Sequence, residues 1–259
     1  MSGILWDELV FGPIRSRRLG NSLGVNLLPG SKKICTFNCV YCECGWGEEI
    51  ENKDDKLPKL EKIIPALEKR LIELKEQKFD LNSITFAGNG EPSLHPEFVE
   101  IINNVLQLRD IHAPQAKVTC LSNSTMIHKV GIREALMKID NPWMKLDAGS
   151  DLMYRRINKV FKNLSLSEIV ENLIKMKGNL SIQTLLLRGE MDGEIIDNTS
   201  EKEVEVWIEH LKKIKPRSVI LYPIDRETPL SKLEKISDEE LEKIADKVRK
   251  VGINTVVYS

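Results

Sequence analysis

Short apolar runs alternate with longer amphipathic stretches along most of the chain. The apolar runs have strand length, and several end in glycine, proline, serine or asparagine. They predict seven strands, over residues 23–28, 83–87, 117–121, 143–148, 180–187, 218–222 and 253–258. Between the strands, apolar residues recur at helical spacing. This predicts helices over residues 59–78, after Pro96, and over residues 130–138, 167–177, 204–214 and 238–251, with Pro65 kinking or delaying the first.

This order of elements predicts an α/β fold: a single (β/α)6-type partial TIM barrel with parallel strands and a short extra C-terminal strand. The barrel core covers about residues 20–225 and carries N-terminal and C-terminal extensions. No shift in composition marks a second domain, so we expect one domain over residues 1–259. Residues 190–200 are polar, and we expect them to form a loop between a strand and the next helix.

Composition narrows the classes of function. The 259 residues carry 38 Lys+Arg and 39 Asp+Glu, a formal net charge of -1, so no global positive field attracts polyanions. Aromatic residues make up 5%, which argues against an extended base-stacking surface. No apolar run reaches the roughly 18 residues of a membrane span, and the N-terminal stretch lacks the pattern of a signal peptide. We therefore expect a cytoplasmic protein without a membrane partner.

Four of the five cysteines lie close together, as Cys35-x3-Cys39-x2-Cys42 followed by Cys44. Thiolates are soft ligands that suit zinc or iron–sulfur clusters. The loop follows the first predicted barrel strand, at the end of the barrel where active sites lie. A structural zinc site usually takes four ligands in two separated pairs, so three thiolates on one loop favour an iron–sulfur cluster. Structural zinc and unrelated buried thiols remain alternatives, and Cys120 is expected in the core.

Polar residues also follow the later strands. Ser122 and Asn123 come after the third strand, where they either reach a bound cofactor or cap the next helix. Lys145 and Asp147 lie two residues apart on a strand and therefore share one face, which we expect to point inward. Opposite charges inside a barrel suit either a bound zwitterion or a structural ion pair. Gln183, a polar residue on a barrel strand, is a further candidate.

Two motifs carry a resemblance to a known family. The stretch CTFNCVYC resembles the CxxxCxxC signature of the radical S-adenosylmethionine superfamily, with an aromatic residue, Tyr41, before the third cysteine. The segment FAGNGEP, residues 86–92, resembles the "GGE" segment of that superfamily, which binds the methionine amino group. The resemblance extends from about residue 20 to about residue 225.

The resemblance implies a [4Fe-4S] cluster held by Cys35, Cys39 and Cys42, with its fourth iron chelated by the amino and carboxylate groups of S-adenosyl-L-methionine (SAM). Reduction of the cluster then cleaves the sulfonium C–S bond to methionine and a 5′-deoxyadenosyl radical, which abstracts hydrogen from a substrate. An electron donor of the flavodoxin or ferredoxin type is the expected partner.

The cofactor-binding residues expected on these grounds come from several strand ends. Glu91 is expected to accept from the amino group, with glycines on either side of Asn89 permitting close backbone approach; a surface Asn-Gly turn is the alternative. Lys145 is expected to pair with the methionine carboxylate, and the segment from Tyr222 to Ile224 resembles the apolar segment that packs against adenine. The full set is Tyr41, Gly88, Asn89, Gly90, Glu91, Ser122, Asn123, Lys145, Asp147, Gln183, Tyr222 and Ile224.

Six residues are candidates for substrate contact. The guanidinium groups of Arg15, Arg17 and Arg18 precede the first barrel strand, and planar guanidinium suits phosphate or carboxylate. Asp225 and Arg226 follow the sixth strand. A solvated basic surface and a local ion pair are the respective alternatives. The sixth candidate is Cys44, as a free or substrate-facing thiol rather than a cluster ligand.

The segments SLGVNLLP and FAGNGEPSLHPEF look most like the branch related to tRNA wyosine-base synthases. A modified nucleoside in tRNA is therefore a candidate substrate, although the extra cysteine-bearing and flavodoxin-like segments of that branch are absent from this chain. A glycyl-radical-enzyme activase is the alternative enzyme. A non-catalytic iron–sulfur or zinc protein is the third interpretation, against which GNGEP argues because a carrier needs no second cofactor loop. The sequence does not indicate an oligomeric state.

Overall fold

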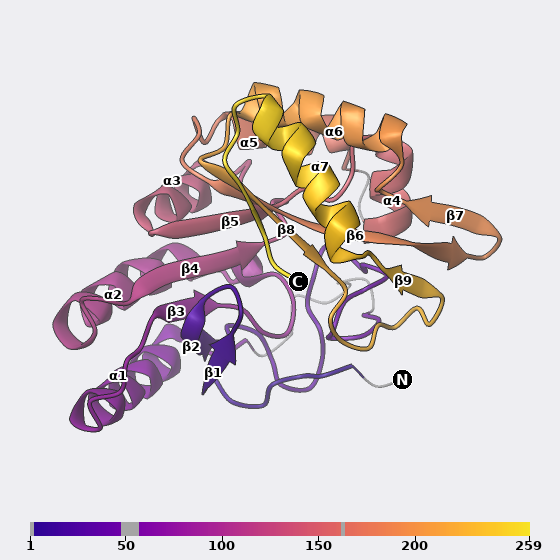
Figure 1. Ribbon diagram of the computed structural model, residues 1–259. Helices are drawn as coiled ribbons and strands as arrows, with labels where there is room; N and C mark the ends of the chain where they lie inside the picture. The colour runs from indigo at the N-terminus through magenta and orange to yellow at the C-terminus, as the bar shows by residue number, and fades with distance from the viewer. Residues whose placement is uncertain (1–2, 48–56, 162–163) are drawn as a thin grey trace.

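The computed structural model describes residues 3–47, 57–161 and 164–259. Eight strands form one continuous path in a curved sheet, in the order β1-β2-β3-β4-β5-β6-β8-β10 (Figure 1). From β2 to β10 every neighbouring pair is parallel, while β1 is antiparallel to β2 at one edge. The bounds are β1 (Val10–Ser16), β2 (Gly20–Val25), β3 (Ser83–Phe86), β4 (Lys117–Ser122), β5 (Asn141–Lys145), β6 (Ser181–Met191), β8 (Ser218–Pro223) and β10 (Thr255–Val257).

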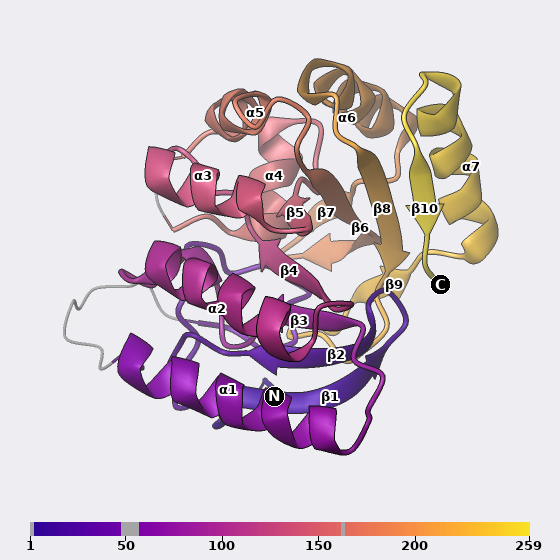
Figure 2. The same ribbon diagram turned by 90° about the vertical axis from the view of Figure 1, so that its left-hand side faces the viewer.

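The helices lie on the outside of this sheet. Figure 2 shows α1, α2, α3, α5, α6 and α7 in an arc around it. Their bounds are α1 (Leu60–Glu76), α2 (Phe98–His112), α3 (Val130–Lys138), α4 (Asp151–Asn158), α5 (Leu166–Ile174), α6 (Glu201–Ile214) and α7 (Asp238–Lys250), with a short 3-10 turn over Pro92–Leu94. The predicted partial barrel, with parallel strands, outer helices and a short C-terminal strand, is confirmed. None of the helices in the described ranges is both long and apolar enough to cross a membrane.

The core lies between the sheet and this arc, and helix α1 illustrates how sequence spacing produces it. Ile63, Leu67, Leu71 and Leu74 recur at helical spacing and are all buried. All four residues of β3 are buried as well, as expected of a parallel strand covered on both faces. Pro65 lies inside α1, which begins at Leu60 and continues to Glu76, so it neither delays nor ends the helix.

The expectation for residues 190–200 is wrong. Strand β6 continues to Met191 and turns back into β7 (Glu194–Asp197), and β9 (Leu233–Lys235) pairs with the other side of β6. The turn residues Asp192 and Gly193 both have positive φ, which is the Asp-Gly hairpin signal. Strand β1 and helix α4 were also not predicted from the sequence. In the β6–β7 hairpin, polar residues interrupt the alternation of apolar and polar positions that predicts a strand.

Asn198 fixes the base of this hairpin against the barrel. Its side-chain oxygen accepts from the Leu187 amide at 2.8 Å. Its amide nitrogen donates to the carbonyls of Leu185 and Asp147, each at 2.8 Å. Since Asn198 is buried, one side chain satisfies three backbone groups and ties the strand ends β5 and β6 together.

We expect Asn198→Ala to lower the free energy of unfolding by about 3 kcal/mol, because three backbone groups lose their partners in a dry interior. Urea unfolding measures this. Ile195→Ala, on the same hairpin at a side chain 68% exposed, is the matched control and should change stability by less than about 0.5 kcal/mol. Equal stability of the two variants would contradict the anchoring role of Asn198.

Candidate functional site

Two loops meet at the carboxyl ends of β2 and β3. The Ile34 amide donates to the Asn89 carbonyl at 2.8 Å, and the Glu91 amide donates to the Ile34 carbonyl at 2.9 Å. Gly90 lies between these bonds with φ of +135°, and a Cβ added to it would lie 1.8 Å from the Ile34 oxygen. Only glycine fits there. The cysteine loop and the GNGEP loop are thus joined backbone to backbone.

The thiols of the cysteine loop receive N–H donors. The Phe37 amide and the Asn123 side chain each donate to Cys35 Sγ at 3.4 Å. Lys145 Nζ lies 3.3 Å from Cys39 Sγ. Cys35, Cys39 and Cys42 all line one cavity of about 650 Å³. In the described part of the chain, no three histidine, cysteine, aspartate or glutamate side chains are grouped so as to hold a single metal ion.

Charge at this loop favours one thiolate in particular. The pKa of Cys42 is lowered, first by a hydrogen bond from the Cys44 thiol and then by the ammonium of Lys33. The hydrogen bond to Cys42 raises the pKa of the Cys44 thiol, and Cys44 Sγ also lies 3.3 Å from the Gly88 carbonyl oxygen. Burial instead raises the pKa of Cys35 to about 12. Cys44 therefore differs in role from its neighbour: in this arrangement it is a hydrogen-bond donor.

Lys33 is a functional residue that the sequence interpretation missed. Its side chain is only 7% exposed, and its ammonium donates to the Gly45 carbonyl at 3.0 Å and to Asn38 Oδ1 at 3.3 Å. Burial lowers its pKa, but the charges of the neighbouring cysteines outweigh this, so the pKa is raised. A lysine two residues before a cysteine loop was the available signal, since buried ammonium needs anions nearby.

Glu91 lies at the end of the GNGEP loop and is 1% exposed. Its carboxylate accepts from the hydroxyl of Ser122 at 2.9 Å, the amide of Asn123 at 2.5 Å, and both the amide and the hydroxyl of Ser93. Burial raises the pKa of this carboxyl, and the four hydrogen bonds reverse the effect only in part. The ends of β3 and β4 are thereby held together around a buried acid on the cavity wall.

Asn89, a predicted cofactor-binding residue, has a structural set of contacts. Its side chain is fully buried and accepts from the Trp6 amide at 2.8 Å. It also donates to the carbonyls of Trp6 and Pro29, each at 2.8 Å. Asn89 therefore anchors the N-terminal segment, while the glycines on either side, Gly88 and Gly90, line the cavity.

Lys145 and Asp147 do share one face, and they pair with each other at 2.7 Å. The Tyr41 hydroxyl donates to Asp147 and accepts from Lys145. Asp147 also accepts from the Leu185 amide at 3.0 Å. Lys145 thus contacts Asp147, Tyr41 and Cys39, and its pairing with a cofactor carboxylate stays a prediction.

The three arginines before β2 lie at the open side of the sheet. Arg17 pairs with Asp225 at 2.7 Å and also donates to the Ser259 carbonyl. Arg226 pairs with Glu43 of the cysteine loop at 2.6 Å. The first of these exposed ion pairs joins the β1–β2 turn to the segment after β8, and the second joins that segment to the cysteine loop. The other substrate and cofactor candidates here, namely Arg15, Arg18, Gln183, Tyr222 and Ile224, line the same cavity.

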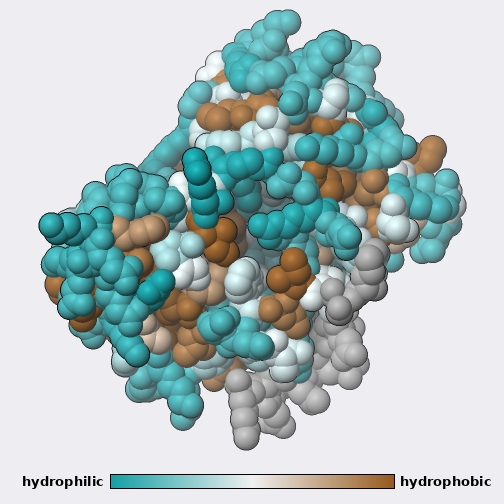
Figure 3. All heavy atoms as spheres, turned by 60° about the horizontal axis from the view of Figure 1, so that its bottom comes forward, coloured by the Kyte–Doolittle hydropathy of each residue, from teal (hydrophilic) through white to brown (hydrophobic). Residues whose placement is uncertain are grey.

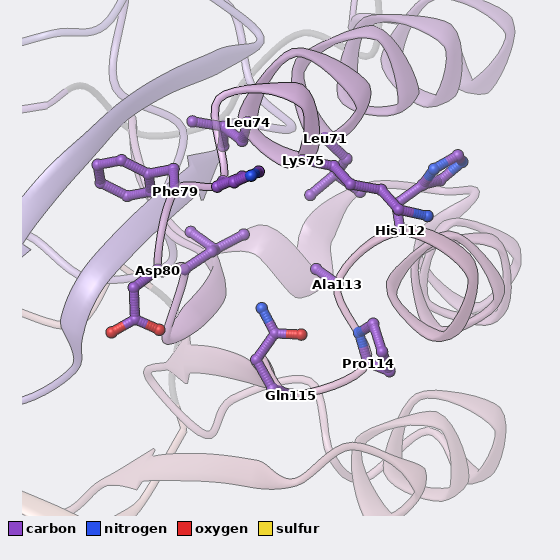
Figure 4. A pocket seen from close by; sticks show the side chains of 11 residues that line it. Leu71, Leu74, Lys75, Phe79, Asp80, His112, Ala113, Pro114 and Gln115 are labelled. Atoms are coloured by element: carbon purple, nitrogen blue, oxygen red, sulfur yellow. The ribbon is translucent and has the colours of Figure 1, made fainter.

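The molecule has a hollow on the side where these segments meet. Figure 3, in which the lower side of Figure 1 comes forward, shows a depression near the middle of that face, bordered by hydrophilic and hydrophobic side chains. A second cavity of about 460 Å³ lies elsewhere, at the amino ends of β3 and β4, with Lys75, Asp80 and His112 on its walls (Figure 4). It contains no thiol, and barrel chemistry takes place at the opposite strand ends.

Comparison with known proteins places these features in a family. The profile of the "Radical SAM superfamily" matches residues 32–201. A "UPF0026 protein" of Helicobacter pylori is 32% identical over 237 residues, which cover 90% of this chain and 71% of that protein. A Brachyspira hyodysenteriae protein named "GTPase Obg" is 32% identical over 243 residues, which cover 92% of this chain and 33% of its own. This chain thus spans a third of the Brachyspira protein.

Solved structures agree on the fold. A radical SAM methyltransferase from Sphaerobacter thermophilus superposes with a TM-score of 0.65 and 15% identity, over 92% of this chain and 65% of that one. TYW1 with a lysine-pyruvate adduct superposes with a TM-score of 0.62 and 17% identity, over 88% of this chain and 73% of the other. At these identities the likeness shows the partial barrel and nothing of the substrate.

We expect Gly90→Ala to destabilise the protein by about 3 kcal/mol or more, because the added Cβ forces the two loops apart and strains the backbone. Urea unfolding is again the measurement. Gly131→Ala, on helix α3, is the control: its Cβ would meet only Val99 at 3.8 Å, and we expect a gain of about 0.5–1 kcal/mol. Similar stabilities for the two variants would mean that the loops are not rigidly joined.

Proposed function

This chain belongs to the radical SAM superfamily and is an enzyme of that superfamily, and on that premise we propose that it binds a [4Fe-4S] cluster through Cys35, Cys39 and Cys42 and uses it to cleave SAM reductively. One observation carries the proposal: the three thiols and the loop that contains Glu91 lie at neighbouring strand ends and line the same cavity. When bound, the cluster supplies one electron, which breaks the sulfonium C–S bond to give methionine and a 5′-deoxyadenosyl radical that takes a hydrogen atom from the substrate.

The donor set of the loop fits such a cluster. Iron–sulfur centres are held by cysteine thiolates and tuned by hydrogen bonds to sulfur and by nearby charge. Cys35 and Cys39 already face N–H donors, and the ammonium groups of Lys33 and Lys145 oppose the negative charge of the thiolates. The cavity supports the second half of the proposal, since about 650 Å³ is within the usual range for a small-molecule site.

The chain's own groups would hold SAM as follows. Glu91 has a lone pair left on the oxygen that accepts from Asn123, and this oxygen would accept from the amino group of the cofactor. Gly88 and Gly90 leave room for backbone contact beside it. Tyr222 and Ile224, on the opposite wall, offer an apolar surface for adenine. An external donor of the flavodoxin or ferredoxin type would supply the electron.

The substrate and the finer classes stay predictions. A tRNA nucleoside remains a candidate from the sequence motifs, with the arginines of the β1–β2 hairpin as its cationic contacts. An activase of glycyl-radical enzymes and a non-catalytic carrier remain the alternatives. The tRNA-modifying enzyme and the activase would both cleave SAM, whereas the carrier would not. SAM cleavage is therefore the first measurement.

Anaerobic reconstitution with iron and sulfide, followed by SAM and dithionite, should yield 5′-deoxyadenosine, which mass spectrometry detects. We expect Cys35→Ala, Cys39→Ala and Cys42→Ala to lower this yield at least about 100-fold and to lose bound iron, because each removes a ligand. Cys120→Ala, a buried core cysteine on β4, is the control and should keep its iron. If the addition of SAM leaves the EPR spectrum of the wild-type cluster unchanged, this result would support the non-catalytic carrier instead.

Cys44→Ala separates a ligand from a hydrogen-bond donor. We expect this variant to retain iron at the wild-type level, because the Cys44 thiol donates a hydrogen bond to the Gly88 carbonyl and is not one of the three proposed ligands. Iron and sulfide analysis of the reconstituted protein measures it. Loss of iron to the level of Cys39→Ala would make Cys44 a ligand and would overturn this assignment.

A further inference from the structure

Two arginines that line the cavity, Arg15 and Arg18, make no ion pair within the part of the chain that the structure describes, and only Arg18 of the two is half-buried. Three other cations on the cavity walls, Arg17, Lys145 and Arg226, are each paired with a carboxylate. Glu91 has four donors. Within residues 3–47, 57–161 and 164–259, the half-buried guanidinium of Arg18 makes no ion pair.

Arg18 is nevertheless held in place. Its guanidinium carbon lies 4.2 Å from the centre of the Tyr222 ring and 5.9 Å from that of Trp143. Its guanidinium also donates to Gln183 Oε1, at the long distance of 3.4 Å. Stacking fixes the plane of the group and leaves in-plane donors free to bind. The side chain is therefore positioned by aromatic rings of β5 and β8 and not neutralised by them.

We propose that Arg18, with Gln183 beside it, forms a subsite for an oxyanion of the substrate, either a carboxylate or a phosphate. The planar fork of arginine matches both groups with two parallel hydrogen bonds. Arg15, also on the cavity wall and without an ion pair in the described residues, adds positive charge at the exposed rim. This inference rests on the proposed function, since it assigns the substrate of the same cavity.

The subsite is separate from the residues proposed to hold SAM by its amino group. Those residues come from the ends of β3 and β4, whereas Arg18, Gln183 and Tyr222 come from the β1–β2 hairpin, β6 and β8. Tyr222 also lies close enough to influence Tyr41 and Lys145 electrostatically, and these flank Cys39. An anion bound at Arg18 would thus hold a substrate next to the thiol end of the cavity.

Isothermal titration calorimetry tests this with two probes, inorganic phosphate and succinate, on the reconstituted protein with SAM present. We expect at least one probe to bind, and the one that binds more tightly identifies a phosphate or a carboxylate substrate. Arg18→Gln should weaken that binding at least tenfold, and Arg18→Lys should weaken it less, because it keeps the charge but not the fork. Arg156→Gln, a half-buried arginine of α4 outside the cavity, is the control and should bind as wild type.

Two results would overturn the inference: neither probe binds, or Arg18→Gln binds both as wild type does. A third would also do so: a tenfold loss of SAM affinity in Arg18→Gln and Arg18→Lys, which would assign the guanidinium to the cofactor's own carboxylate. Failure here is distinct from failure of the proposed function. A protein that makes 5′-deoxyadenosine but binds no probe loses only the subsite, whereas one that binds a probe but assembles no cluster loses the radical chemistry.

Discussion

The two backbone hydrogen bonds between Ile34 and the Asn89–Glu91 segment are the constraint on which the site depends. They join a loop that carries thiols to a loop that carries a buried acid, although some fifty residues separate the two in sequence. Gly90 makes the junction possible because no side chain fits between the strands of this bridge. Asn89 connects the same junction to the N-terminal segment, because its side chain both accepts from and donates to the backbone of Trp6.

Electrostatics organise the rest of the cavity. Lys145 contacts Cys39 Sγ, and Lys33 interacts with the charges of the cysteines from behind the cavity wall. Glu91 accepts four hydrogen bonds, and Lys145 neutralises Asp147. Each buried charge thus has an opposite charge or a set of dipoles, as a dry interior requires. Arg15 and Arg18 are the exceptions among the described residues that line the cavity: neither makes an ion pair, and Arg18 is half-buried whereas Arg15 is exposed.

Much of the fold and part of the site could be predicted from the sequence. Parallel strands are buried on both faces, so their apolar runs stood out and gave the barrel order. The cysteine and GNGEP motifs are local in sequence and were found for that reason. The role of the Asn89 side chain could not be found in this way, because it contacts Trp6, and no local pattern records a contact between segments so far apart in the chain. Lys33 and the hairpin did carry local signals, a lysine two residues before the cysteine loop and an Asp-Gly turn, and the sequence interpretation missed them.

The open edge of the sheet has a consequence for how a molecule reaches the interior. The segment after β8 is joined to the β1–β2 turn by the Arg17–Asp225 ion pair and to the cysteine loop by the Arg226–Glu43 ion pair, and both pairs are about half exposed. Such pairs contribute about 0–1 kcal/mol apiece and weaken further in salt. Separating them would require no strand to unpair, and the stack of Arg18 on Tyr222 would then be the contact that still joins the β1–β2 turn to β8.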